Sequence, residues 1–277
     1  MRKSNYYRVL DHGFVGYIDH LGSDELIEQF ARVSYGKGTR KKTDTAGLIN
    51  YLVRNKHTSP LESCEIIFHL AMPICCARQL VRHRTCNMNE SSARYSEVPD
   101  VWYTPAYERM TSQSSTNKQG SSNEPIFTQE EYAEWVKKHN EANQRAFENY
   151  QELLAKGCAR ETARNDLPLS CYTTMFWKMD LHNFLHFLNL RADEHAQWEI
   201  RQYAYIMGTI AKRLFPITMD AWEKHVYNSI SLNSDEQGVF YGGELLASVK
   251  AKLNKKKYDF DTPIIPVNPE ELLLCTK

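Results

Sequence analysis

The chain has 277 residues, of which 42% are hydrophobic, 12% aromatic and 25% charged. These proportions are ordinary for a globular protein with a sizeable core, and they exclude disordered, collagen-like and coiled-coil classes for the whole chain. The 34 basic and 34 acidic residues give zero net charge, which argues against bulk nucleic acid or an anionic membrane as the main partner. No apolar run approaches the roughly 20 residues of a membrane helix, and residues 1–5 lead into no secretory signal.

Cysteine usage indicates the cellular compartment. The chain has seven cysteines and no Cys-x-x-Cys motif, so neither a disulfide framework nor a zinc ribbon is expected. Cys75 and Cys76 are adjacent and cannot form a disulfide without strain. We therefore expect a protein of the reducing cytoplasm.

Strands and helices both occur in the first third of the chain. Gly36 and Gly38 are expected to end an early helix, and Pro73 suits the first turn of a later one because its missing N–H is not needed there. In chain order, the patterns predict a strand at 13–21, a helix from about 24 to 35, a helix at 45–55, a strand at 64–72 and a helix at 74–84.

Helices dominate the remainder. Thr128 and Glu131 form a capping-box pattern that starts a helix. Small polar residues at 111–125 cannot bury apolar area, so a loop or disordered insert is expected there. The other expectations are an amphipathic helix at 129–156, continuous helix at 181–214, and a peripheral tail at 231–277 with a helix near 244–254. Early strands followed by helices favour an α+β fold, and no glycine-rich Rossmann or P-loop motif is present.

The densest group of polar side chains lies at residues 78–96, which we call the arginine segment. Arg78 and Arg82 are four residues apart and would share one face of the predicted helix, at the end where the helix dipole favours cations. Arginine is suited to phosphate because its planar fork donates two parallel hydrogen bonds. The arginine segment is therefore interpreted in one of two ways: as a site for a phosphorylated small molecule, or as a solvated face with local ion pairs.

A second polar group lies within residues 182–201. His182 and His186 are one helical turn apart, as are His195 and Glu199, and either spacing could hold a metal. The order His-Glu-x-x-His is absent, and hydrogen-bonded core or surface histidines are the commoner case. Polar groups among phenylalanines need partners, which a bound ligand or a subunit interface would provide.

Four stretches together resemble one family, the flavin-dependent thymidylate synthases. The family signature is Arg-His-Arg, seven residues and then Ser, and this chain carries it at 82–92, followed by Arg-Tyr-Ser at 94–96. Residues 57–62, 159–168 and 188–200 resemble its other motifs in the same order, and the resemblance spans about residues 13–230. Asp166 departs from the family pattern, which usually has an aliphatic residue there.

The resemblance implies an α+β fold of the thymidylate synthase-complementing type, with a central mostly antiparallel sheet flanked by long helices. It implies a methyltransferase that converts dUMP to dTMP with methylenetetrahydrofolate as carbon donor and NADPH-reduced FAD as hydride source. It further implies a cytoplasmic homotetramer with shared active sites, a catalytic domain at 1–230 and a C-terminal extension at 231–277. No nucleic acid, membrane or metal is expected.

The same resemblance implies roles for individual residues. Arg191 would be catalytic, because a fixed guanidinium would stabilise the negative charge that develops on the uracil ring. The residues implied for FAD are Ser59, Arg82, His83, Arg84, Glu90, Asp180, His182 and His186. Those implied for dUMP are Gln79, Leu80, Val81, Arg82, Glu90, Ser91, Ser92, Ala93, Arg94, Arg164 and Arg191.

The chemistry of the nucleophile separates this family from thymidylate synthases that work without flavin, which use a Cys in a Pro-Cys-His context. That context is absent here, so Cys75, Cys76 and Cys86 are interpreted as small apolar residues. Ser92 is interpreted as a dUMP ligand and not as a nucleophile, since no His-Asp arrangement clearly activates it. Two alternative functions are a nucleic-acid-binding module and a helical metalloprotein. The zero net charge and the match to the family signature argue against both.

Overall fold

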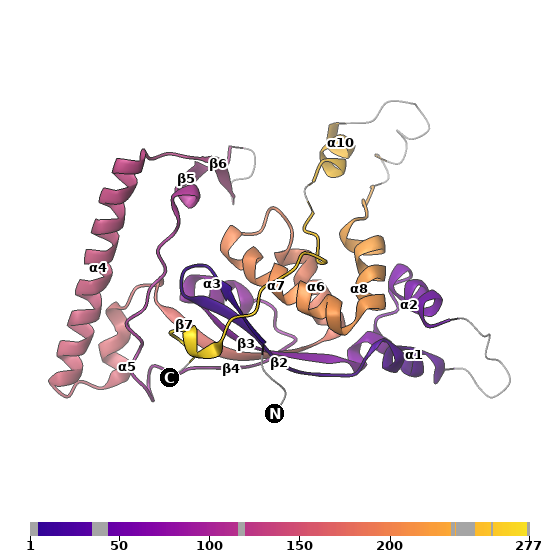
Figure 1. Ribbon diagram of the computed structural model, residues 1–277, viewed down its shortest axis with the longest axis horizontal. Helices are drawn as coiled ribbons and strands as arrows, with labels where there is room; N and C mark the ends of the chain where they lie inside the picture. Colours follow the sequence, from indigo (N-terminus) through magenta and orange to yellow (C-terminus); the bar gives the residue numbers. More distant parts are fainter. Residues whose placement is uncertain are drawn as a thin grey trace. The chain divides into compact units, whose positions relative to one another are not determined.

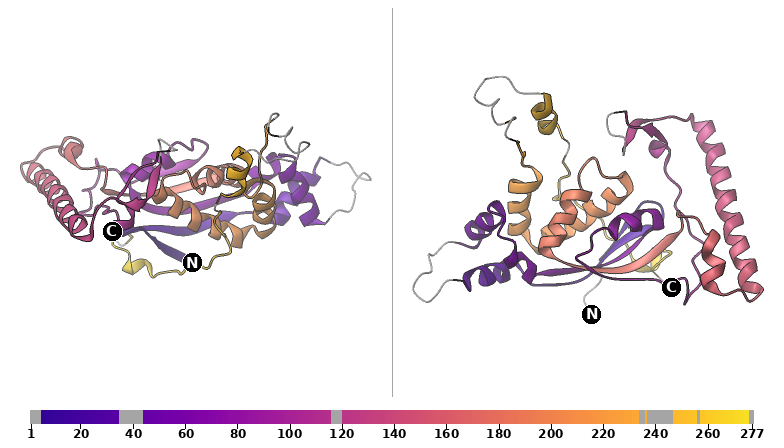
Figure 2. Two further views of the ribbon diagram at one scale, coloured as in Figure 1. Left: turned by 90° about the horizontal axis from the view of Figure 1, so that it is seen from above. Right: turned by 180° about the vertical axis from the view of Figure 1, so that it is seen from behind.

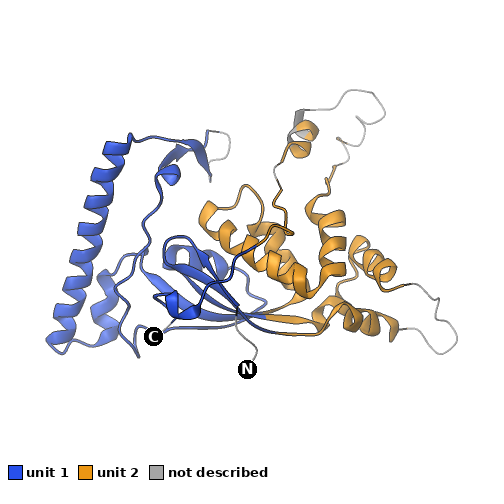
Figure 3. Ribbon diagram, in the orientation of Figure 1, with its two compact units in different colours: residues 1–19, 67–178, 264–277 blue, residues 20–66, 179–263 orange. Residues whose placement is uncertain are grey.

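The computed structural model describes residues 5–34, 44–115, 120–233, 236, 247–255 and 257–275. The chain divides into two compact units (Figure 3). Unit 1 comprises residues 1–19, 67–178 and 264–277, and unit 2 comprises residues 20–66 and 179–263. Each unit is therefore assembled from segments that are far apart in the sequence.

A five-stranded sheet carries the α+β fold that the sequence predicts. Its strand order is β1-β2-β3-β7-β4, and the β1/β2 and β4/β7 pairs are antiparallel. The predictions of strands at 13–21 and 64–72 are confirmed by β2 and β3, whereas the other three strands were not predicted. The strands are β1 (Asn5–Val9), β2 (Gly13–Leu21), β3 (Glu65–Pro73), β4 (Asn87–Glu90) and β7 (Tyr172–Asp180).

The core of unit 1 includes the end of the chain. Tyr6 packs edge-on against Phe14, with ring centroids 5.2 Å apart, and the Val267 N–H donates to the Tyr6 carbonyl over 2.7 Å. Leu272 and Leu274 belong to the same buried cluster. The expectation of a peripheral tail is therefore wrong for this part of residues 231–277, because its apolar side chains complete a core that the β1–β2 hairpin begins.

The long helix of unit 1 is confirmed. Helix α4 (Gln129–Ala155) is one uninterrupted helix (Figure 1, Figure 2). Its capping box is formed as predicted: the Glu131 N–H donates to Thr128 Oγ1 over 3.2 Å, and the Thr128 N–H donates to Glu131 Oε2 over 2.7 Å. Only Asn143 and Tyr150 of α4 are buried, so most of the helix surface is exposed in a single chain.

The polar insert at 111–125 is not simply a loop. Strands β5 (Thr111–Gln113) and β6 (Ser121–Pro125) form a two-stranded antiparallel hairpin. These strands pair through their backbones and through the Ser112 and Ser122 hydroxyls, 3.0 Å apart, which needs no buried apolar side chain. Residues 116–119 lie outside the described residues.

Helices make up most of unit 2. The helices predicted near 24–35 and 45–55 are confirmed as α1 (Asp24–Arg32) and α2 (Thr45–Arg54), although Gly36 and Gly38, the predicted stop of the first, lie outside the described residues. The buried Asp24 carboxylate accepts hydrogen bonds from the Ile217 and Thr218 backbones and from Thr218 Oγ1. It thereby caps α8 (Pro216–Trp222), which the sequence did not reveal. Helix α10 (Ala247–Leu253) matches the helix predicted near 244–254, within the described residues.

The continuous helix expected at 181–214 is wrong. The structure has α6 (Leu181–Arg191) and α7 (Trp198–Leu214), separated by residues 192–197, which we call the α6–α7 turn. The Asp193 carboxylate accepts from the His195 N–H over 2.9 Å, and the Ala196 N–H donates to the Asp193 carbonyl over 3.0 Å. An Asp side chain that bonds to the backbone two residues later is a turn former that competes with helix.

Candidate functional site

The arginine segment begins with a short helix and continues in a tight turn. Helix α3 (Ile74–Leu80) ends earlier than the predicted helix at 74–84, because the His83 N–H donates to the Leu80 carbonyl over 3.0 Å and closes the chain into a turn. The prediction that Arg78 and Arg82 share a helix face is therefore wrong, since Arg82 lies beyond the helix. Leu80 is fully buried, whereas Val81 is exposed.

The turn places charged groups on both sides of a buried ring. His83 is only 8% exposed, whereas Arg82 and Arg84 on either side of it are exposed. Burial fixes the imidazole and with it the backbone from which the two guanidinium groups project. Two exposed guanidinium groups on a fixed turn are suited to bind a phosphate or pyrophosphate.

Beyond this turn the arginine segment becomes an edge strand. Strand β4 pairs with β7, with Glu90 opposite Met175, and the buried Thr173 donates from Oγ1 to Glu90 Oε1 over 2.7 Å. The Ser91 N–H donates to the Thr174 carbonyl over 2.9 Å. The sheet therefore fixes both residues while their side chains stay exposed.

Residues 92–96 form a second turn. The Ser92 carbonyl accepts from the Tyr95 and Ser96 N–H groups, and Ser92 Oγ accepts from the Arg94 N–H over 3.3 Å. Ser92 and Ala93 are half-buried, and Arg94 is exposed. Ser92 therefore orients the backbone of the arginine that follows it.

An ion pair joins the arginine segment to a distant part of unit 1. Arg94 Nε lies 3.0 Å from Glu161 Oε2 in α5 (Arg160–Ala163), with the two side chains 57% and 55% exposed. Arg164, at the start of the 3-10 turn η3 (Arg164–Asp166), follows directly. Two stretches of the predicted dUMP site are thus neighbours within one unit. Sequence reasoning missed Glu161, whose only signal is its place between Arg160 and Arg164.

Asp166, the departure from the family pattern, has a structural role. Asn149 Nδ2 of α4 donates to Asp166 Oδ2 over 3.2 Å, and α4 packs against η3. The Asp166 carboxylate therefore connects η3, the turn that carries the half-buried Arg164, to α4 by a hydrogen bond. An aliphatic residue at this position could connect the two elements only by packing.

In unit 2 the predicted FAD residues lie on two elements in contact. The 3-10 turn η1 (Ser59–Ser63) packs against α6, and the Leu181 N–H donates to the Cys64 carbonyl over 2.8 Å. Ser59 and His186 are exposed, and His182 is half-buried. The structure therefore brings Ser59 into the neighbourhood of the α6 residues.

Asp180 has a second role as the N-cap of α6. Its Oδ1 accepts from the Asn183 N–H over 3.0 Å and its Oδ2 from Asn183 Nδ2 over 2.8 Å. This cap fixes the start of the helix that carries His182, His186 and Arg191.

Arg191 is the last residue of α6 and is half-buried. Burial lowers the pKa of its guanidinium below the ordinary value. A partly desolvated cation acts more strongly on a nearby charge than one in water does, which suits a group that stabilises a developing anion.

Among the residues that the structure describes, no group of three or more His, Cys, Asp or Glu side chains is arranged to hold a metal ion. His195 and Glu199 do not share a helix, because His195 lies in the α6–α7 turn and Glu199 in α7. His195 Nδ1 lies 2.7 Å from Asp193 Oδ1, and Glu199 accepts from Gln197 Nε2 over 2.8 Å. Each therefore has a local partner.

None of the seven cysteines forms a disulfide. Burial raises the pKa of the Cys64 and Cys86 thiols and, together with Asp100, raises that of Cys171 to about 11. Cys76 is fully buried. A nucleophilic cysteine needs a lowered pKa, so these features agree with the interpretation of the cysteines as packing residues.

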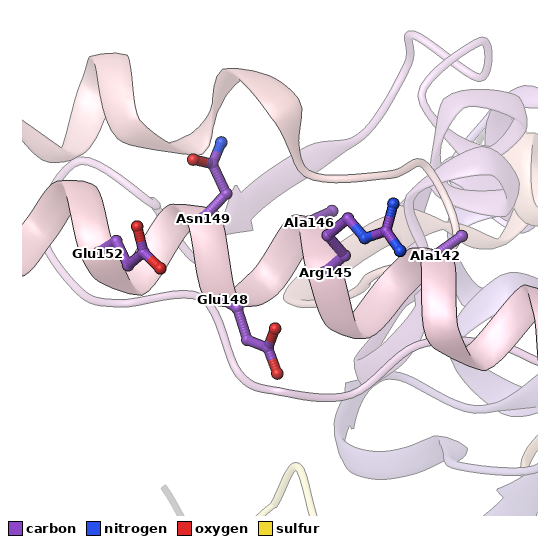
Figure 4. Close-up of a pocket in the computed structure, with 6 residues that line it drawn as sticks. All are labelled: Ala142, Arg145, Ala146, Glu148, Asn149 and Glu152. Atoms are coloured by element: carbon purple, nitrogen blue, oxygen red, sulfur yellow. The ribbon is translucent and has the colours of Figure 1, made fainter.

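Two open hollows of unit 1 contain none of the predicted site residues. One, of about 560 Å³, lies between α4 and residues 100–104 and reaches Leu273. The other, of about 580 Å³, is lined by six residues of α4 (Figure 4): Ala142, Arg145, Ala146, Glu148, Asn149 and Glu152.

Comparison with known proteins places the chain in context. Residues 17–217 match the family model described as "Thymidylate synthase complementing protein". The chain is 46% identical over 227 residues to a flavin-dependent thymidylate synthase of Wolbachia pipientis, covering 82% of this chain and 79% of that protein. It is 45% identical over 230 residues to one of Treponema denticola, covering 83% and 86%. It also resembles the crystal structure of the UMP/dUMP methylase PolB from Streptomyces cacaoi bound with 5-Br dUMP, with a TM-score of 0.70, 33% identity and coverage of 78% and 97%.

Proposed function

This chain belongs to the family of flavin-dependent thymidylate synthases, and we propose that it methylates dUMP to dTMP with FAD, methylenetetrahydrofolate and NADPH. The methyltransferase activity on dUMP follows from the family. The observation that carries the assignment of residues is the Arg94–Glu161 ion pair, because it makes neighbours of two arginine-bearing stretches that resemble the family's dUMP motifs.

We assign the dUMP phosphate to Arg94 and Arg164. Arg94 is exposed and Arg164 half-buried, and an arginine pair can hold a phosphate dianion through several charge-assisted hydrogen bonds. The ion pair with Glu161 restrains the Arg94 side chain, so part of the cost of ordering that side chain is met before dUMP binds. The remaining ligands that we assign to dUMP are Gln79, Leu80, Val81, Arg82, Glu90, Ser91, Ser92 and Ala93, with Leu80 contributing through its backbone.

Arg191 is the residue that we assign to the chemical step. Negative charge develops on N3 and O4 of uracil as C5 becomes nucleophilic, and a fixed guanidinium stabilises that charge. The half-buried position of Arg191 supports this role, since partial burial reduces the screening of the interaction by water.

The proposed reaction uses no enzyme thiolate. The thiols of Cys64, Cys86 and Cys171 have raised pKa values, and Pro-Cys-His is absent from the sequence. Ser92 is committed to the turn at 92–96, which supports a role in binding.

The chemistry of the donor set fits FAD. Arg82 and Arg84 project from the turn that buries His83 and suit a pyrophosphate, and Ser59, His182 and His186 offer donors along η1 and α6. Glu90 and Asp180 complete the set that we assign to this cofactor. When bound, FAD supplies the hydride that completes the methyl group, with NADPH as the reductant and methylenetetrahydrofolate as the carbon source.

We further propose a cytoplasmic homotetramer with shared active sites. The exposed length of α4, with only Asn143 and Tyr150 buried, supports contact with another subunit, and seven cysteines that form no disulfide support a reducing compartment. Among the described residues, no helix has the length and apolar character needed to cross a bilayer.

An absorbance spectrum tests the proposal. Purified protein should be yellow, its flavin absorbance should bleach on addition of NADPH, and the spectrum should respond to dUMP. Flavin should co-elute with protein at the mass of a tetramer. A colourless protein whose spectrum ignores added FAD, NADPH and dUMP would contradict the proposed function.

A further inference from the structure

Two connections within unit 2 link the C-terminal extension to the end of the helix that carries Arg191. The relevant part of the extension follows α10 and comprises Lys255 and residues 257–260, which we call the tail segment. It lies outside the stretch of about 13–230 that carries the family resemblance. In Figure 1 the chain after α10 runs back toward α7 and α6.

The first connection passes through a buried tyrosine. Tyr227, 2% exposed, donates from its hydroxyl to the Ala192 carbonyl over 3.1 Å. The same hydroxyl accepts from the Tyr258 N–H over 3.1 Å. Ala192 is the C-cap of α6 and the residue directly after Arg191, so two hydrogen bonds link the tail segment to the backbone of the residue next to Arg191.

The second connection is ionic. Lys255 Nζ lies 3.2 Å from Asp193 Oδ2, with the side chains 30% and 25% exposed. The other carboxylate oxygen accepts from the backbone and from Nδ1 of His195. Burial opposes ionisation of Asp193, but hydrogen bonds from His195 and Lys255 overcome it and hold its pKa at about 2. The carboxylate thus stays charged and anchors the α6–α7 turn to the tail.

Aromatic packing holds the tail segment in place. Tyr258 stacks on Tyr205 of α7 with ring centroids 4.0 Å apart and planes 5° from parallel. Phe260 is fully buried and contacts the Trp222 and Tyr227 rings. A methyl group added to Gly208 would lie 2.2 Å from the Phe260 ring, so α7 needs a glycine there to admit the tail.

We propose that Tyr227 and Lys255 are positioning residues, through which the tail segment fixes the end of α6 and thereby the guanidinium of Arg191 for dUMP. The inference rests on the proposed role of Arg191. Without the two connections, the α6–α7 turn would depend on the contacts of Asp193 with His195 and Ala196 and on the hydrogen bond from Arg201 to the Glu194 carbonyl, and Arg191 would sample more positions. An arginine that must be ordered on binding costs affinity for its ligand.

The test uses the full-length holoenzyme with Tyr227→Phe and Lys255→Met. Tyr227→Phe keeps the ring and removes only the hydroxyl, and Lys255→Met keeps the length of the side chain and removes its charge. Each should weaken dUMP binding, measured by flavin absorbance titration, about three- to tenfold, the range of one hydrogen bond. Flavin content and the KM for NADPH should stay at parent values, a split that general loss of structure would not produce.

Two controls sharpen the test. Lys252→Met removes a lysine of α10 that pairs with Glu236 and the Ser231 carbonyl and not with the α6–α7 turn, so dUMP affinity should not change. Lys255→Arg should restore affinity. In an Arg191→Gln background, Tyr227→Phe and Lys255→Met should have no further effect on dUMP binding, because residues that act through Arg191 are not additive with it.

The outcomes are distinguishable. If Arg191→Gln loses dUMP affinity while Tyr227→Phe and Lys255→Met bind dUMP as the parent does, the positioning inference is overturned and the proposed function stands. If Arg191→Gln itself binds and turns over dUMP normally, the assigned role of Arg191 fails and the inference fails with it.

Discussion

In unit 1 the arginine segment presents Arg82 and Arg94 to solvent from two turns, whereas in unit 2 Arg191 is half-buried at the end of a helix. The turns of unit 1 are held by contacts within the arginine segment and with β7. The end of α6 is held by Tyr227 and Lys255, 36 and 64 residues away in the sequence. Exposed cations suit capture of a mobile anion, and a partly buried one suits stabilisation of charge at a fixed atom.

The comparison of the two regions predicts that the half-buried Arg191 contributes more to catalysis than the exposed arginines do. Arg191→Gln should lower kcat/KM for dUMP by about a thousandfold, as loss of one fixed electrostatic contact in a reaction site does. Steady-state kinetics checks this, with flavin content and thermal stability as controls for folding. Arg191→Lys should recover only part of the loss, because an ammonium lacks the planar fork. If Arg191→Gln had the kinetics of the parent, the proposed difference in role between the half-buried Arg191 and the exposed arginines of unit 1 would be wrong.

The exposed arginine should contribute mainly to binding. Arg94→Gln should weaken dUMP binding about ten- to thirtyfold through loss of a charge-assisted hydrogen bond, with a smaller effect on kcat. Calorimetric titration with dUMP measures it.

Glu161→Gln is the matched control for Arg94, because it breaks the same ion pair but keeps the guanidinium. It should change dUMP affinity by no more than about threefold, and both variants should lose less than about 1 kcal/mol of stability, since the pair is exposed. Equal loss of affinity in both variants would mean that the ion pair, and not the guanidinium, is what dUMP requires.

The α6–α7 turn should be sensitive to acid. The pKa of Asp193 in the folded chain is about 2, below its ordinary value of 3.8, so its contribution to stability is complete above about pH 5 and is lost as the pH falls toward 2. Its size is no more than about 2 kcal/mol. Urea unfolding at pH 3 to 6 should show the free-energy difference between the parent and Asp193→Asn shrinking as the pH falls. A difference independent of pH would show that the Asp193 charge does not stabilise the turn.

The sequence predicted the elements whose residues alone determine them. The capping box of α4 and the start of α3 directly after Pro73 depend on residues within one helical turn, and both are confirmed, although Pro73 is the extended N-cap and does not lie in the first turn of the helix. Strand β4, Asn-Met-Asn-Glu, has no strand pattern and is a strand only because its backbone pairs with β7. The break after α6 depends on Asp193, one residue in an otherwise helical pattern.

The same limit applies to the site. The motif of residues 82–92 identifies the family without any structure. It does not reveal that α3 ends at Leu80 or that His83, in the turn that follows, is buried. Glu161 and Lys255 act on residues 67 and 62 positions away, and a single sequence contains no pattern that links such pairs.

Ser92 provides the clearest test of the role of the turn at 92–96. Ser92→Ala removes the hydroxyl that accepts from the Arg94 N–H and that we assign to dUMP, so affinity should fall about tenfold or less while turnover remains measurable. Ser96→Ala is the matched control, because Ser96 Oγ donates only to the Ser92 carbonyl, over 3.4 Å, and is exposed; it should bind dUMP as the parent does. Complete loss of turnover in Ser92→Ala with normal dUMP affinity would instead indicate a nucleophilic serine, and the arginine segment would then hold reacting atoms as well as substrate.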